Sequence, residues 1–315
     1  MYRSPNRRCF LGVLAGGAAG LALPCAAFAQ RPPMEGGDTP ILATKLTGAL
    51  TLFSGAGGNV IVVDGADGLV MINGGLSERS AELLKAVAAH TGGKPIRFLF
   101  NTDWHRIHTG SNETVGRSGA TIVAHENTKQ YLGAEIVVDW QSRTYKPLPA
   151  TALPTRTFYT SGTLTLGAET IDYGHLGQAH TDAAIYVHFP ASNVLVAGGA
   201  VSVGAYPIPD YTTGGWLGGL VAANKTLLGV AKADTRIVPG LGPLQTRADL
   251  QAQHDMLAAL MDRFAKMMKQ GMGPDDIIAA APSKDFDATW GKPDAFVSAA
   301  YRSMWLHVRE LGGIV

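Results

Sequence analysis

The sequence has no cysteine beyond position 25, because Cys9 and Cys25 are its only two cysteines. Both lie in an N-terminal stretch that looks like a removable leader. Once that leader is cleaved, the chain can form no disulfide, has no thiol nucleophile and offers no thiolate to a metal. Any bound metal would then have to be held by histidine and carboxylate side chains.

Charge is also scarce. Charged residues make up 16% of the 315 residues, and the formal net charge is +1. Three of the basic residues, Arg3, Arg7 and Arg8, belong to the leader, so the rest of the chain is slightly acidic. Without a basic stripe to contact phosphates, we expect no nucleic-acid partner. The hydrophobic share of 46%, with 39 glycines and 17 prolines, is typical of a globular protein with many turns, and it specifies no oligomeric state.

The chain also lacks a hydrophobic run long enough to cross a bilayer comfortably. Its apolar run, residues 11–23, follows Arg7-Arg8 and precedes Ala27-Phe28-Ala29, a small-residue cleavage pattern. This arrangement predicts a twin-arginine signal peptide over residues 1–29, cleaved before Gln30. The mature protein should then be periplasmic and free of the membrane. A short membrane anchor is the alternative, and the cleavage pattern argues against it.

The remaining sequence predicts a linker over residues 30–44 and a single domain over residues 45–315 with a helical C-terminal part. Alternating or continuous apolar runs predict strands, and apolar residues at helical spacing predict a helix over residues 77–90. A stretch rich in proline, up to Pro154, separates two sets of strands and helices. Two such halves, packed sheet to sheet with helices outside, would form a four-layer αββα sandwich. The expected strands are residues 46–53, 59–63, 69–72, 96–100, 121–124, 163–166, 170–173, 184–189, 193–197 and 236–238.

Five short motifs occur in order along this domain. Together they resemble the landmarks of the metallo-β-lactamase superfamily, in particular its exported members described as hydrolases. The resemblance covers residues 46 to about 255 and implies the αββα fold. The motifs are Val70-Met71-Ile72-Asn73-Gly74-Gly75, Asn101-Thr102-Asp103-Trp104-His105-Arg106-Ile107-His108, Gly177-Gln178-Ala179-His180-Thr181-Asp182, Val194-Leu195-Val196-Ala197-Gly198-Gly199 and Val238-Pro239-Gly240-Leu241-Gly242-Pro243.

The resemblance also implies a dinuclear metal site, from which this sequence departs. The positions of the first metal carry Asp103, His105 and His180. Two histidines and one carboxylate are the donors of several catalytic zinc sites, and they also suit Fe(II) as a second choice. Among the positions that correspond to the ligands of the second metal, only His108 has a side chain that can ligate. The other three positions of that second site are Ile107, Gly199 and Leu241, and the supporting aspartate of the family is replaced by Asn73.

Each of these residues also has a structural interpretation. Asp103 could cap a turn, and His105 and His180 could be a hydrogen-bonded buried pair. His108, without its partners, could be a packing residue. Asp182 could cap its loop or orient His180 through the second ring nitrogen.

Two hypotheses of function follow from these residues. The first is a hydrolase with at most one zinc ion, which would act on an ester, lactone or amide-type bond of a small molecule. The second is a catalytically inactive descendant that binds a small molecule or assists assembly in the periplasm. His105 and His180 favour the first hypothesis, whereas the combined replacements favour the second. Fold alone cannot decide between them.

Overall fold

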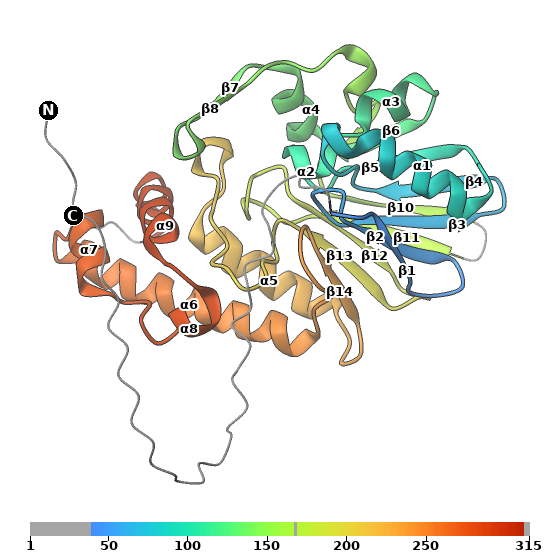
Figure 1. Ribbon diagram of the computed structural model, residues 1–315. Coiled ribbons are helices and arrows are strands. Elements are labelled where there is room, and N and C mark those ends of the chain that lie inside the picture. The colour runs from blue at the N-terminus through green and yellow to red at the C-terminus, as the bar shows by residue number, and fades with distance from the viewer. Residues whose placement is uncertain (1–38, 167–168, 312–315) are drawn as a thin grey trace, which may run out of the picture. The chain divides into compact units, whose positions relative to one another are not determined.

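The computed structural model describes residues 39–166 and 169–311. The predicted leader, with Arg7, Arg8 and the proposed cleavage site before Gln30, lies outside the described residues. The described chain forms two β-sheets packed face to face, with helices on both outer faces (Figure 1). The predicted αββα sandwich is therefore confirmed.

The first sheet contains seven strands. Its N-terminal strands form antiparallel hairpins, whereas β4, β5, β6 and β9 run parallel to one another. In sheet order the strands are β1 (Leu42–Lys45), β2 (Leu50–Ser54), β3 (Val60–Gly65), β4 (Gly68–Ile72), β5 (Ile96–Phe100), β6 (Thr121–His125) and β9 (Arg156–Phe158).

The second sheet contains five strands, antiparallel except for the parallel last pair, β13 and β14. A separate two-stranded hairpin, β7 (Ile136–Val138) and β8 (Arg143–Tyr145), extends from the first half of the chain. The strands of the second sheet are β10 (Ser161–Leu166), β11 (Glu169–His175), β12 (Ile185–Phe189), β13 (Val194–Gly198) and β14 (Arg236–Pro239).

Strand β4 shows how the sequence builds the layers. Its side chains alternate in direction, as in any strand, yet all five residues are buried. Val70 and Ile72 pack into the core between the two sheets. Leu69 and Met71 point the other way and pack under the helices of the outer layer, with Leu83 of α1. A continuous apolar run is therefore required, because both faces of this sheet are covered.

The helices fall into two outer layers. Those that follow β4 and β5 cover the first sheet, and α5, α6 and α9 cover the second through a large apolar cluster. The long helix α6 begins at a capping box in which Thr246 and Asp249 satisfy each other's backbone N–H groups. The helices are α1 (Ser80–Thr91), α2 (Arg106–Thr109), α3 (Asn112–Arg117), α4 (Glu126–Gly133), α5 (Leu217–Val230), α6 (Arg247–Lys269), α7 (Pro274–Ala280), α8 (Asp287–Trp290) and α9 (Asp294–Leu306), with 3-10 turns η1 (Ser77–Arg79), η2 (Asp139–Gln141), η3 (Ala150–Ala152) and η4 (Tyr211–Thr213).

The structure differs from the expected elements in two places. Strand β1 lies partly in the segment assigned to the linker, because residues 42–45 pair along the edge of β2. The proline-containing stretch expected to be irregular contains the β7–β8 hairpin and the short strand β9. These strands have three residues each, too few for a periodic pattern to be recognised. Among the helices of the described ranges, none is both long and apolar enough to span a bilayer.

Two histidines stack where the sheets meet. The rings of His125, which ends β6, and His175, which ends β11, lie 3.9 Å apart between centroids at an interplanar angle of 16°. Burial, reinforced by the neighbouring His175, lowers the pKa of His125 to about 4. His125 also caps α4, because its Nδ1 accepts a hydrogen bond from the N–H of Asn127.

We expect this stack to make stability depend on pH. The folded state holds His125 neutral down to about pH 4, whereas an unfolded histidine binds a proton near pH 6.5. The contribution of His125 to the free energy of unfolding should therefore be fully present above pH 6.5 and should fall as the pH decreases towards 4. His125→Asn keeps a capping side chain and removes the titration, so its urea-unfolding free energy should fall less than that of the wild type between pH 7 and 5. His90→Asn, at an exposed histidine, is the control; equal pH dependence in all three proteins would contradict the prediction.

Candidate functional site

The candidate site begins where β5 ends. Asn73, which follows β4, adopts a left-handed backbone conformation with φ 67°, one that asparagine tolerates better than most residues. Its Oδ1 accepts hydrogen bonds from the backbone N–H and the hydroxyl of Thr102, at 2.9 and 3.0 Å. Asn73 thus fixes the backbone immediately before Asp103.

Asp103 is the centre of a buried hydrogen-bond network. Its Oδ1 accepts three hydrogen bonds: from the backbone N–H of His105 at 2.8 Å, from Nδ1 of His105 at 3.0 Å and from Nδ1 of His108 at 2.8 Å. The residue is fully buried. Its second oxygen, Oδ2, has no hydrogen-bond partner among the residues that the structure describes.

His105 lies between two carboxylates. Its Nδ1 faces Asp103, and its Nε2 lies 3.2 Å from Oδ2 of Asp210. Asp210 is fully buried and also accepts hydrogen bonds from the indole N–H of Trp140 at 3.1 Å and the hydroxyl of Thr213 at 2.7 Å. The contact of Nε2 with Asp210 is a close approach without a hydrogen bond, so Nε2 has no hydrogen-bond partner among the described residues. The two neighbouring carboxylates nevertheless favour the protonated form of the ring.

The pKa values follow from this arrangement. Burial alone would lower the pKa of His105, but the charge of Asp103 and its hydrogen bond, joined by Asp210, raise it to about 10. Burial alone would raise the pKa of Asp103, yet the charges of His108 and His105 hold it well below its usual range. Against the same burial effect, the hydrogen bond and charge of His105 lower the pKa of Asp210 to about 2.

His180 lies beside this network as a neutral ring. Its Nδ1 donates to the carbonyl of Ile208 at 2.7 Å, so Nε2 is left as the acceptor. The rings of His105 and His180 are 4.7 Å apart between centroids. Burial and the nearby imidazolium lower the pKa of His180 to about 4.

Asp182 does not orient His180 in this arrangement. Its Oδ1 accepts from the hydroxyl of Tyr131 at 2.8 Å, and its backbone N–H donates to the carbonyl of Thr213. The Ile208 carbonyl holds the ring of His180 instead. The alternative interpretation of Asp182, as a residue that fixes its own loop, agrees with these contacts.

The predicted metal ligands come together, but not as a ligand set. Within the described ranges, no group of three or more His, Cys, Asp or Glu side chains is arranged to hold a metal ion. His105 and His108 both direct Nδ1 at Oδ1 of Asp103, and Nε2 of each ring has no hydrogen-bond partner among the described residues. Ligation of a single zinc or iron ion by Asp103, His105 and His180 therefore remains a prediction.

An apolar cleft adjoins the network. It has a volume of about 220 Å³, and its lining includes Ile107, Gly199 and Leu241, the positions where the family resemblance leads one to expect ligands of a second metal. His180 is the only histidine, acid or base among the described residues that line it. Valine, alanine, proline and aromatic side chains supply most of the remaining wall, namely Trp140, Val201, Val203, Ala205, Tyr206, Pro207 and Ile208.

Gly199 keeps the cleft and the network in contact. A Cβ at this position would lie 2.7 Å from Cδ2 of His180 and 3.1 Å from Oδ2 of Asp103. The first distance is shorter than side chains tolerate without movement. The absent side chain therefore lets both polar groups approach the cleft wall.

Sequence analysis missed Asp210, which completes the network. It lies outside the five motifs, in a loop after β13, and Pro209-Asp210-Tyr211 reads locally as a turn. An aspartate two residues before Thr212 is the usual signal of a capped turn, and it does cap η4. That signal gives no indication that the same carboxylate also faces His105.

The ion pair between His105 and Asp210 generates a pH-dependent prediction. A histidine pKa raised from 6.5 to about 10 contributes stability below pH 6.5 that is lost as pH rises through 10. Asp210→Asn should lower the pKa of His105, so the contribution should be smaller and its loss should be complete at a lower pH. It should also reduce the free energy of unfolding at pH 7 by about 3 kcal/mol, since one partner of a buried pair is removed.

The measurements are urea unfolding from pH 6 to 9.5 and an NMR titration of His105. Asp262→Asn, in an exposed ion pair with Lys266, is the matched control and should cost at most about 1 kcal/mol. A His105 titration unchanged by Asp210→Asn would contradict the proposed charge state.

Comparison with solved structures agrees with this fold. A metallo-beta-lactamase from Pontibacter korlensis is 21% identical, with a TM-score of 0.57 over 70% of this chain and 99% of that chain. The metallo-beta-lactamase DIM-1 is 18% identical, with a TM-score of 0.55 over 70% and 99%. A double mutant of the sec-alkyl sulfatase PisA1 is 14% identical, with a TM-score of 0.67 over 84% of this chain and 50% of that chain.

Sequence comparison supplies the family. The family model described as "Metallo-beta-lactamase superfamily" matches residues 54–244, well over half of the chain. The matched region contains all five motifs, the buried network around Asp103 and the apolar cleft. The chain belongs to the metallo-beta-lactamase superfamily.

Proposed function

We propose that this member of a hydrolase-like superfamily is a binding protein: it holds a small, neutral, largely apolar molecule in the cleft beside His180. One observation carries the proposal. Ile107, Gly199 and Leu241 line a single apolar cavity whose one basic group, His180, is neutral. Catalysis through two metals would need ligands at these positions, and none of these side chains can ligate.

The apolar lining of the cleft and the ring nitrogen of His180 determine which ligands it can bind. Transferring apolar surface from water into it is favourable by about 25 cal/mol per Å². A charged ligand would lose hydration there without gaining an opposite charge. The Nε2 of His180 accepts a hydrogen bond, so the fitting molecule has an apolar body and one hydroxyl or N–H donor.

A thermal-shift and calorimetry screen with neutral cyclic alcohols tests this proposal. At a concentration of 100 times the dissociation constant, a bound alcohol should stabilise the protein by about 2.7 kcal/mol. Leu241→Asp places a charge in the cleft and should abolish the shift. Leu42→Asp, the same change at an exposed strand residue, should leave it intact. If no alcohol stabilises the wild type, or if both variants respond alike, the cleft is not the binding site.

The second candidate is a hydrolase with one metal ion. It is favoured by the buried Oδ2 of Asp103, which has no partner in the described part of the chain and points towards the same glycine as His180. Relatives in this superfamily typically bind zinc. The neutral His180 keeps Nε2 available, and Nε2 of His105 has no hydrogen-bond partner among the described residues.

Elemental analysis of protein purified with added zinc separates the two candidates. We expect the wild type to hold far less than one zinc per chain, because His105 and His108 both hold Nδ1 against Asp103 and no three side chains of the described ranges are arranged around a metal. Asp103→His removes the carboxylate that engages Nδ1 of both His105 and His108, and should raise the zinc content towards one. About one zinc in the wild type, lost in His105→Ala, together with hydrolysis of an ester or lactone, would establish the second candidate instead.

We propose further that the protein acts in the periplasm after export by the twin-arginine route. Replacing Arg7 and Arg8 together by lysine should retain the protein in the cytoplasm, whereas Arg3→Lys should not. Cell fractionation followed by N-terminal sequencing measures both location and cleavage near Gln30. Undiminished export of the double variant would exclude this route.

A further inference from the structure

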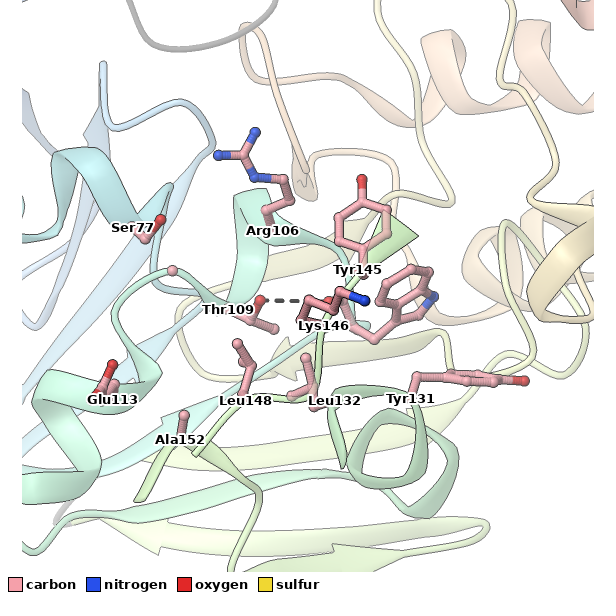
Figure 2. A pocket seen from close by; sticks show the side chains of 12 residues that line it. Ser77, Arg106, Thr109, Glu113, Tyr131, Leu132, Tyr145, Lys146, Leu148 and Ala152 are labelled. Carbon is pink, nitrogen blue, oxygen red and sulfur yellow. Dashed lines mark hydrogen bonds between the residues drawn. The ribbon is translucent and has the colours of Figure 1, made fainter. Parts of the chain in front are cut away.

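A second cavity is lined by Trp104, the residue that lies between Asp103 and His105 in the sequence. It has a volume of about 180 Å³ and contains none of the network residues in its described lining. Figure 2 shows Leu132, Leu148 and Ala152 together on one side, with Tyr145 and Lys146 opposite and Arg106 beyond them. The cavity is thus built by α2, α4 and the β7–β8 hairpin with the segment that follows it.

Its walls are aromatic and aliphatic. Trp104 lines the cavity, and its ring lies 5.0 Å from that of Tyr145 at 82° and 5.8 Å from that of Tyr131 at 50°. Leu148 is among the large apolar side chains that remain exposed, at 36%. Aromatic rings favour tilted and edge-to-face contacts with one another, so a flat ring that enters the cavity can pack against these walls in the same way. Ligand cavities usually measure about 300–1,000 Å³, so this smaller volume limits the ligand to one or two rings.

The rim of the cavity carries more positive than negative charge. Arg106 and Lys146 both line it, and each pairs with an acid outside the lining: Arg106 with Glu78 and Lys146 with Glu135. Glu113 is the one acid in the described lining, and it pairs with Arg117 on its own helix. The Lys146–Glu135 pair is exposed, and exposed pairs are worth about 0–1 kcal/mol, so an anion on a bound ligand can compete for Lys146.

From these observations we propose that this cavity is a second binding site, specific for a planar aromatic carboxylate of one or two rings. The ring inserts among Trp104, Tyr145 and the leucine wall. The carboxylate lies at the mouth and pairs with Lys146. A neutral ring of the same shape gains the apolar contacts but not the charge, and therefore binds more weakly.

Isothermal titration calorimetry of the mature protein with 2-naphthoate tests the site, with 2-naphthamide as the neutral isostere. We expect one naphthoate per chain, bound about tenfold more tightly than the amide at low salt, a difference that shrinks as salt is added. Equal affinities, or no binding of naphthoate, would overturn the proposal.

Variants locate the bound molecule. Lys146→Gln should weaken naphthoate binding by about fivefold to tenfold and leave the amide unchanged. Lys129→Gln, the same change at an exposed lysine of α4 outside the lining, should have no effect. Leu148→Ala should weaken both ligands, because it removes apolar wall. Equal effects of the two lysine variants would place naphthoate elsewhere.

The experiment is independent of the proposed function. Leu241→Asp alters the cleft beside His180 and leaves the lining of this second cavity intact, so it should not change the affinity for naphthoate. Loss of naphthoate binding in Leu241→Asp would show that the molecule occupies the cleft, and would overturn the second site. Absence of alcohol binding to the cleft would leave this result untouched.

Discussion

The close approach of His105 to two buried carboxylates, Asp103 and Asp210, is the interaction on which the site depends. A charged ring buried among apolar layers is tolerated only when opposite charges and hydrogen bonds surround it. Asp103 comes from the end of β5, and Asp210 comes from a loop after β13 in the other sheet. One ion cluster therefore fixes loops of both halves of the sandwich at the edge where their strands end.

The same charge cluster explains why the replacements at positions 107, 199 and 241 occur together. Oδ2 of Asp103 lies close to the point where a Cβ at position 199 would be. An aspartate at position 199 would therefore add negative charge beside Asp103 and press on His180. A small neutral residue at position 199 removes both conflicts. With Ile107 and Leu241 lining the same space, the wall beside the cluster becomes apolar. The three replacements are therefore consistent with one another. The charged residues lie behind the wall that positions 107, 199 and 241 form, and the cleft on the other side of this wall is neutral.

The sequence predicted the layers and most strands because their signals are local. Strand β5 was expected at residues 96–100 and occurs there, since its apolar run ends at a polar motif. The motifs also predicted that Asp103, His105, His108 and His180 lie close together. The partner of each ring nitrogen was not predictable, because it depends on contacts such as that of His180 with the Ile208 carbonyl, 28 residues away. Short elements such as β7 and β8 were missed, since their pairing stabilises them more than their composition does.

Trp104 connects the aromatic cavity to the charged network. Its indole lines the aromatic cavity, and its ring lies 4.7 Å from that of His105 at 31°. Its N–H donates to the hydroxyl of Thr213, which in turn donates to Asp210. A rotation of the indole would break that hydrogen bond and leave a buried donor unpaired, at a cost of about 1–3 kcal/mol. A ligand in the aromatic cavity must therefore fit against a fixed indole, which favours flat molecules over bulky ones and keeps the charged network undisturbed.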